Sequence, residues 1–96
     1  MLILVCYDVN TEEKAGRRRL ARVAKQCKNH GQRVQKSVFE CQLTEGEVVG
    51  VRRKLLDIID PREDSLRIYR IPEPVEKHRE EYGTFKAIDF RKPMVV

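Results

Sequence analysis

Two kinds of side chain in this sequence could act on an anionic substrate: a carboxylate at the end of an apolar run, and a cluster of arginines soon after it. The carboxylate is Asp8, which follows Met-Leu-Ile-Leu-Val-Cys-Tyr. The cluster is Arg17, Arg18, Arg19 and Arg22. Carboxylates bind divalent cations and guanidinium groups match phosphate geometry. The pair of features therefore indicates phosphate or nucleic-acid chemistry.

The run that precedes Asp8 predicts a strand, and its apolar composition is typical of one covered on both faces. Side chains alternate along a strand, so Cys6 and Asp8 share one face while Val5 and Tyr7 share the other. An ionised carboxylate is costly to bury unpaired. We therefore expect Asp8 at the exposed C-terminal end of the strand, with a cation or a hydrogen-bond donor beside it.

Asp8 has two interpretations. It could cap the following turn by accepting backbone N–H bonds. Alternatively it is a catalytic, metal-binding residue: Mg²⁺ keeps several waters and often takes only one or two protein carboxylates, so two copies of Asp8 related by a twofold axis could share one ion. Such an ion would promote phosphodiester hydrolysis. Three later acids are predicted only to cap and turn the chain after the second helix: Asp57, Asp60 and Asp64.

The arginines fall on one side of a predicted helix. Leu20, Val23, Ala24 and Cys27 form its apolar stripe, and the opposite side is basic with few acids to offset it. This side is either a solvated surface or a track for phosphates. A phosphate backbone could follow Arg17, Arg18, Arg19, Arg22 and Lys25 on this helix, and the patch could extend to Arg33, Lys36, Arg67 and Arg70.

Composition agrees with an anionic partner and excludes other classes. The 96 residues carry 20 Lys and Arg against 15 Asp and Glu, a formal net charge of +5. The apolar run is far shorter than the ~20 residues needed to span a bilayer and lacks a basic leader. We therefore expect no membrane partner and a cytoplasmic location.

The three cysteines are odd in number and include no Cys-x-x-Cys pair, which argues against a disulfide framework. Cys27-x-x-His30 supplies at most half of a four-ligand zinc site. Each cysteine lies on an apolar face, so we interpret all three as free thiols packed like small hydrophobic residues.

The remaining elements can be placed from their patterns. A first helix begins either at the possible capping box Asn10 to Glu13 or, because Gly16 lowers propensity, nearer Arg17, and it ends at residues 29–31. Residues 32–43 are strand-like, but their alternation slips near residues 36–37, which predicts a bent strand or a tight hairpin. A capping box at residues 44–47 opens a second helix closed by residues 60–61. Residues 66–71 alternate as a half-exposed strand.

This order, β-α-β-(β)-α-β, predicts an α+β, ferredoxin-like fold with two helices on one face of an antiparallel sheet. Residues 1–72 would form this core domain. Residues 73–96 form a tail with one strand-like stretch at 85–90, which cannot fold alone. That stretch needs a sheet edge, in its own sheet or in that of a second subunit.

Several stretches together resemble the CRISPR-associated Cas-two family. They are Tyr7-Asp8-Val9, Arg22-Val23-Ala24, the decapeptide Gly-Gln-Arg-Val-Gln-Lys-Ser-Val-Phe-Glu at residues 31–40, and Asp-Ser-Leu-Arg-Ile-Tyr at residues 64–69. The resemblance implies a ferredoxin-like homodimer whose C-terminal strands cross onto the partner's sheet. It also implies that Asp8 is the metal-binding acid, paired with its copy, and that the family's nucleic-acid surface falls on Arg17, Arg18, Arg19, Arg22 and Arg33.

Members of the family are described both as metal-dependent nucleases and as scaffolds that hold spacer DNA between integrase dimers. Our first hypothesis is a dimeric Mg²⁺-dependent endonuclease acting on RNA or double-stranded DNA. The alternative is a non-catalytic scaffold that binds duplex DNA and the CRISPR integrase, and a weaker third is a ribonuclease toxin. An RNA-recognition sheet is disfavoured because no strand is rich in aromatic residues. Phosphate contacts do not distinguish RNA from DNA.

Overall fold

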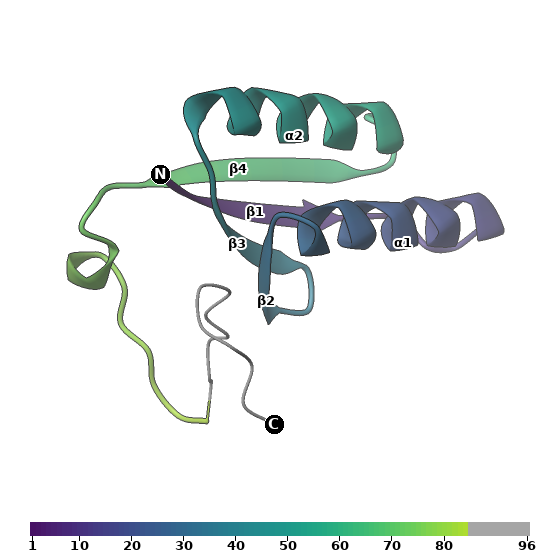
Figure 1. The fold of residues 1–96 in the computed structure, drawn as a ribbon. Helices are drawn as coiled ribbons and strands as arrows, with labels where there is room; N and C mark the ends of the chain where they lie inside the picture. The colour runs from purple at the N-terminus through teal and green to yellow at the C-terminus, as the bar shows by residue number, and fades with distance from the viewer. Residues whose placement is uncertain (85–96) are drawn as a thin grey trace.

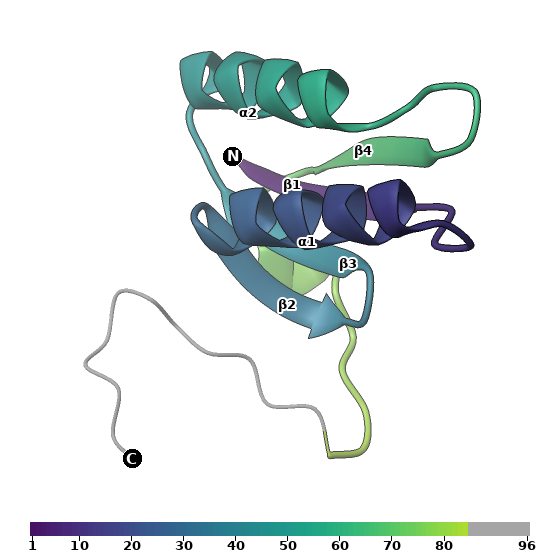
Figure 2. The same ribbon diagram turned by 90° about the vertical axis from the view of Figure 1, so that its right-hand side faces the viewer.

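Four strands form an antiparallel sheet, and both helices cover one of its faces (Figure 1, Figure 2). This computed structural model describes residues 1–84. Neither helix in that range combines the length and apolarity needed to cross a membrane. The elements are β1 (Leu2–Asp8), α1 (Lys14–Lys28), β2 (Gly31–Gln35), β3 (Val38–Gln42), α2 (Glu45–Ile58), β4 (Ser65–Ile71) and a short 3₁₀ helix (Val75–Lys77).

The strand order is β2-β3-β1-β4, so β1 and β3 are inner strands while β2 and β4 lie at the edges. β1 pairs antiparallel with β3 and, over its whole length, with β4. The predicted ferredoxin-like α+β arrangement is confirmed. The strand-like stretch at 85–90 lies outside the described residues.

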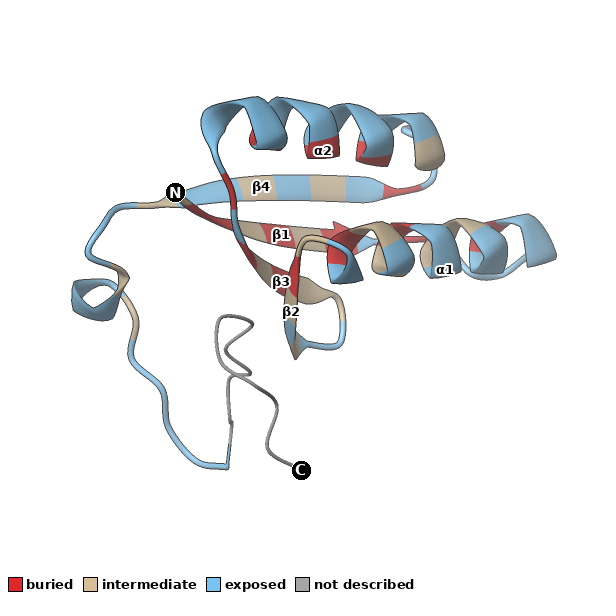
Figure 3. Cartoon of the chain, in the orientation of Figure 1, coloured by how far each residue is buried: buried red, intermediate tan, exposed pale blue. Residues whose placement is uncertain are grey.

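The predicted alternation of β1 determines where the core lies (Figure 3). Ile3, Val5 and Tyr7 are buried towards the helices, together with Phe39 of β3. Leu4 and Cys6 point to the other face and are only half-buried. The apolar composition of β1 predicted a strand covered on both faces. Within residues 1–84 only the face towards the helices is fully covered.

The sheet face without helices, called the open face below, carries Leu4 and Cys6 with their cross-strand neighbours. Glu40 and Tyr69 lie opposite Leu4, and Val38 and Arg67 lie opposite Cys6. After β4 the chain passes behind the sheet on this side (Figure 2). There Arg79 donates to Glu40 at 3.0 Å. The open face thus mixes half-buried apolar and charged groups.

Helix α1 packs through its predicted stripe but starts later than its predicted capping box. Val23 and Cys27 are fully buried, and Leu20 and Ala24 pack against the same core. Asn10 does not cap the helix, since its Oδ1 accepts the N–H of Glu12 at 3.0 Å in a local turn. The helix begins at Lys14, so both predicted starting points were wrong.

The second half follows its local signals more closely. Residues 36–37 form the turn of a tight β2–β3 hairpin, with a register shift between Arg33 and Gln35. The capping box that opens α2 is confirmed, because Thr44 Oγ1 accepts the Glu47 N–H at 3.2 Å and Glu47 Oε1 accepts the Thr44 N–H at 3.0 Å. These bonds hold the pKa of Glu47 below its usual value.

Gly16 lies inside α1 rather than interrupting it. A Cβ atom at this position would overlap the backbone carbonyl of Asn10. The helix therefore rests directly on the chain that leaves β1. Only a residue without a side chain allows this approach.

Replacing Gly16 should separate this packing role from helix propensity. Gly16→Ala should lower the free energy of unfolding by about 1–3 kcal/mol, because the Asn10 backbone must move. The matched change Gly50→Ala in α2 meets nothing within 4 Å. It should raise stability by about 0.5–1 kcal/mol. Urea unfolding measures both, and a Gly16→Ala protein as stable as Gly50→Ala would contradict the close approach of the Asn10 carbonyl.

Candidate functional site

Asp8 is the last residue of β1 and lies opposite Ser65 of β4. Its side chain is exposed, as predicted, and within residues 1–84 no hydrogen bond or ion pair reaches its carboxylate. The capping interpretation is wrong, because the nearby amides have other acceptors. The Asn10 N–H donates to Asp64 and the Glu12 N–H to Asn10. Among the described residues, Asp8 is thus an exposed carboxylate without a hydrogen-bond or ion-pair partner.

The parity of β1 places Asp8 on the same sheet face as Cys6, the open face. Arg67, opposite Cys6, is the diagonal neighbour of Asp8 across the β1–β4 ladder. Its guanidinium donates to the Tyr69 hydroxyl at 3.3 Å, which raises the pKa of Arg67. The described residues contain no Asp8–Arg67 ion pair. Arg67, which the sequence suggested only as an extension of the basic patch, is thus a basic neighbour of Asp8 on the open face.

Arg19 differs from the other predicted phosphate-binding arginines because its guanidinium already has acidic partners. Its Nε lies 2.8 Å from Oδ2 of Asp64 and its Nη2 3.2 Å from Oδ1. The same Nη2 lies 3.2 Å from a carboxylate oxygen of Glu63. Only 15% of the Arg19 side chain is exposed. Most of its donors are therefore engaged within the protomer.

Asp64 is a fully buried carboxylate with several donors around it. Besides Arg19 it accepts the N–H of Asp60 at 2.8 Å and the N–H of Asn10 at 3.0 Å. The bonds from Arg19, chiefly, and from these two amides hold the pKa of Asp64 below its usual value against the effect of burial. Asp64 does shape the turn before β4, as predicted. Its links to Arg19 and Asn10 were not visible in the sequence.

The other predicted arginines lie on the helix side of the sheet. Arg17 donates to the Thr11 carbonyl at 3.1 Å and remains exposed. Arg18 and Arg22 are exposed and form no hydrogen bond within residues 1–84. Arg33 lies with its guanidinium carbon 5.0 Å from the centre of the Phe39 ring. No acidic residue occurs in α1, whose basic residues are Lys14, Arg17, Arg18, Arg19, Arg22, Lys25 and Lys28.

The structure therefore does not gather the predicted site residues into one cluster. Asp8 belongs to the open face, whereas α1 covers the opposite face of the sheet (Figure 1). We call the exposed outer side of α1, formed by Arg18, Arg22 and Lys25, the basic face. In a single protomer the candidate metal ligand and the basic face lie on opposite sides of the sheet.

Metal ligands are sparse in the part of the chain that the structure describes. No group of three or more His, Cys, Asp or Glu side chains there could hold a metal ion. Asp8 fits Mg²⁺ as one oxygen donor, which is half of the two-carboxylate arrangement that we predicted. Cys27 and Cys41 are buried, and burial raises their thiol pKa values to about 12 and about 11. These two thiols pack as small hydrophobic residues, as expected.

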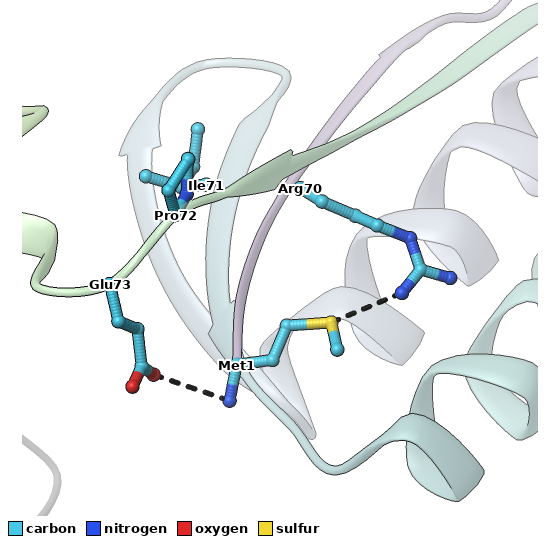
Figure 4. Close-up of a pocket in the computed structure, with 5 residues that line it drawn as sticks. All are labelled: Met1, Arg70, Ile71, Pro72 and Glu73. Atoms are coloured by element: carbon cyan, nitrogen blue, oxygen red, sulfur yellow. Dashed lines mark hydrogen bonds and ion pairs between the residues drawn. The ribbon is translucent and has the colours of Figure 1, made fainter.

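A hollow of about 360 Å³ opens at the other end of β1 (Figure 4). Within it the Met1 amino group lies 3.5 Å from Glu73, and Met1 Sδ accepts from Arg70 at 3.3 Å. Neither Asp8 nor any arginine of α1 lines it, whereas Arg70, suggested as an extension of the basic patch, does. Its lining is Met1, Arg70, Ile71, Pro72 and Glu73.

A four-stranded antiparallel sheet under two helices, with an exposed carboxylate at the end of an inner strand and a basic first helix, defines a small ferredoxin-like α+β protein. The family model described as CRISPR associated protein Cas2 matches residues 1–79. The chain belongs to this Cas2 family, which confirms the resemblance found in its sequence.

Two relatives match this chain over nearly its full length in sequence, and one solved structure matches most of it. The chain is 52% identical to CRISPR-associated endoribonuclease Cas2 1 of Moorella thermoacetica over 96 residues, which cover all of both proteins. It is 42% identical to CRISPR-associated endonuclease Cas2 of Halalkalibacterium halodurans over 95 residues, 99% of each. The crystal structure of Streptococcus pyogenes Cas2 superposes with a TM-score of 0.77 at 49% identity, covering 86% of this chain and 100% of that one.

The contribution of Asp64 to the free energy of unfolding should depend on pH in the acid range. Its folded-state pKa lies below the ordinary value of 3.8, so its stabilisation is present above that pH and is lost as pH falls through the folded-state pKa. Asp64→Asn should unfold about 1–3 kcal/mol more easily at pH 7 and lose less stability below pH ~3.8. Thermal melts across pH measure this. Asp57→Asn, an exposed control, should behave like wild type, and equal pH profiles for both variants would contradict the assignment.

Proposed function

We propose that this chain is a homodimeric, Mg²⁺-dependent endonuclease that hydrolyses phosphodiester bonds of RNA or double-stranded DNA in the cytoplasm. The observation that carries the proposal is the exposed carboxylate of Asp8, which has no partner within residues 1–84. The names of the two relatives, an endoribonuclease and an endonuclease, support the same activity.

A second copy of the chain would complete the metal site. One carboxylate holds Mg²⁺ weakly, and Asp8 belongs to no group of three or more metal-binding side chains in residues 1–84. The open face supplies a reason to associate, because Leu4, Cys6 and Val38 are only half-buried there. Packing two open faces about a twofold axis would bury these groups and bring the ends of two β1 strands near each other.

The edge of β4 would take part in the same dimer. An edge strand presents unpaired backbone groups to an added strand. Beside it, Val49 and Leu56 of α2 are 52% and 54% exposed. Glu45, on the same flank of α2, is held to Arg70 of β4 at 2.7 Å. A strand at residues 85–90 of the partner, reaching from a tail at 73–96 beyond a core at 1–72, would pair with β4 and cover this flank.

In this proposal the two Asp8 carboxylates would hold Mg²⁺, and the ion would supply a bound water of lowered pKa and positive charge against the phosphate. Asp8 contributes negative charge at a strand end that water and a phosphate can reach. The basic face binds the phosphate backbone without reading its sequence. Arg67, beside Asp8 on the open face, is placed to contact a phosphate there.

Replacing Asp8 by Asn removes the charge and keeps the shape. Mg²⁺-dependent cleavage of RNA and of duplex DNA should fall by a factor on the order of 100 or more. Loss of a residue that hydrogen-bonds a metal ligand already costs roughly 10- to 100-fold in activity, and loss of the ligand itself should cost at least as much. Gel assays with Mg²⁺ and with chelator measure this, and Asp57→Asn is the control. Undiminished cleavage by Asp8→Asn would remove the mechanism. Spacer integration without any cleavage by wild type would favour a scaffold that binds the CRISPR integrase.

Reversing charge on the basic face should weaken binding rather than chemistry. In Arg18→Glu/Arg22→Glu, duplex affinity should fall at least roughly tenfold and the salt slope by about 2, one unit for each phosphate that is no longer neutralised. Fluorescence anisotropy in chelator at several salt concentrations measures both. Arg53→Glu, an exposed arginine on α2, is the control. An equal fall in affinity in that variant would mean that binding depends on net charge alone.

A further inference from the structure

The chain that leaves β1 is held at Asn10, two residues beyond Asp8, from two sides. Its N–H donates to Oδ1 of Asp64 at 3.0 Å. Its carbonyl packs against the Cα of Gly16 so closely that a Cβ there would overlap it. The strand end that carries Asp8 is thus fixed by α1 and by the turn before β4.

Asp64 is well placed to fix that strand end because it joins three segments. It immediately precedes Ser65, the residue opposite Asp8 in the β1–β4 ladder. Its carboxylate binds the exit of β1 through Asn10, the Asp60 amide before β4, and α1 through Arg19. One buried side chain therefore links the chain just after Asp8, at Asn10, to the chain just before Ser65, the residue opposite Asp8.

A metal ligand at the end of a strand needs such support. The last pair of a ladder opens most readily, and a carboxylate that shares an ion with its copy must stay within roughly 0.5 Å of its productive position. Asp8 and Ser65 form that last pair, and none of the described residues makes a hydrogen bond or ion pair to the Asp8 side chain.

We propose that Arg19 and Asp64 are positioning residues for Asp8, acting through Asn10 and Ser65, and that Arg19 does not bind nucleic acid. This inference rests on the proposed metal-dependent nuclease function. It divides the arginine triplet by role: Arg18 faces solvent without a partner within residues 1–84, whereas the next residue points inwards to Asp64.

The geometry requires arginine at position 19. Two nitrogens of one planar guanidinium meet both oxygens of Asp64, at 2.8 Å and 3.2 Å. A lysine is a point charge and cannot reproduce this fork. The low pKa of the Asp64 carboxyl agrees with a permanently ionised partner.

The test compares Arg19→Gln with Arg18→Gln in the full-length protein. In Arg19→Gln, duplex affinity in chelator should stay within about twofold of wild type, whereas the Mg²⁺ concentration for half-maximal cleavage should rise about 10- to 100-fold, as for loss of support behind a metal ligand. Amide hydrogen exchange at Asn10 should accelerate. Arg18→Gln should do the reverse: weaker binding with unchanged Mg²⁺ requirement and exchange. An Arg19→Gln protein that loses affinity like Arg18→Gln and keeps the wild-type Mg²⁺ requirement would overturn the proposal.

Two further variants separate positioning from general loss of stability. Arg19→Lys keeps the charge and should recover part of the Mg²⁺ dependence. Val51→Ala weakens the core within α2, where Val51 is buried. It should leave the Mg²⁺ requirement unchanged, and a rise equal to that of Arg19→Gln would overturn the positioning role.

Hydrogen exchange distinguishes failure of this inference from failure of the proposed function. If wild type cleaves nothing with Mg²⁺, the nuclease proposal fails, but faster exchange at Asn10 in Arg19→Gln still supports the positioning of the strand end. Unchanged exchange at Asn10 in that variant would overturn the positioning role whatever the activity of wild type.

Discussion

The register of β1 is the constraint on which the other features depend. Its seven residues pair with β4 from Leu2 opposite Ile71 to Asp8 opposite Ser65. Because side chains alternate, a slip of one residue would turn Asp8 towards the helices and Tyr7 towards the open face. The fully buried row that includes Ile3 and Val5 prevents this slip. Hydrophobic packing on one face thus sets which face presents the carboxylate.

Asp8 and Asp64 show how the surroundings give two identical side chains different roles. Asp64 is buried, and Arg19 with two backbone amides offsets the cost of its desolvation. One of those amides belongs to Asn10, and the side chain of Asn10 takes the next free amide, that of Glu12. These two amides of the loop after β1 are therefore occupied, and within residues 1–84 the carboxylate of Asp8 has no partner.

Local sequence signals predicted most of the fold, whereas the roles of several site residues depend on long-range contacts that the sequence does not show. The stripe of α1 and the Thr44 capping box depend on residues three or four apart, so sequence shows them directly. Gly16 looked like a helix interruption because its neighbour, the Asn10 carbonyl, is set by tertiary packing. Arg19 looked like its basic neighbours because its partner lies 45 residues away in a polar turn. The exposure of the Asp8 side chain was predictable because an unpaired carboxylate is costly to bury, and strand parity showed that it shares a face with Cys6.

The distribution of charge restricts how substrate could reach Asp8. α1 carries seven basic residues and no acid while the chain as a whole is only +5, so the rest of the chain is net acidic. Phosphates are therefore attracted to the helix side, opposite the face of Asp8. In a dimer built on two open faces, the helix layers lie outside and the Asp8 carboxylates lie between the sheets. In such a dimer a bound strand would approach them around the sheet end where β1 stops and α1 starts, because Asp8 is the last residue of β1. Lys14 and Arg17 lie at that end and Lys28 at the other, so in the proposed dimer the first turn of α1 would be the part of the helix nearest to Asp8.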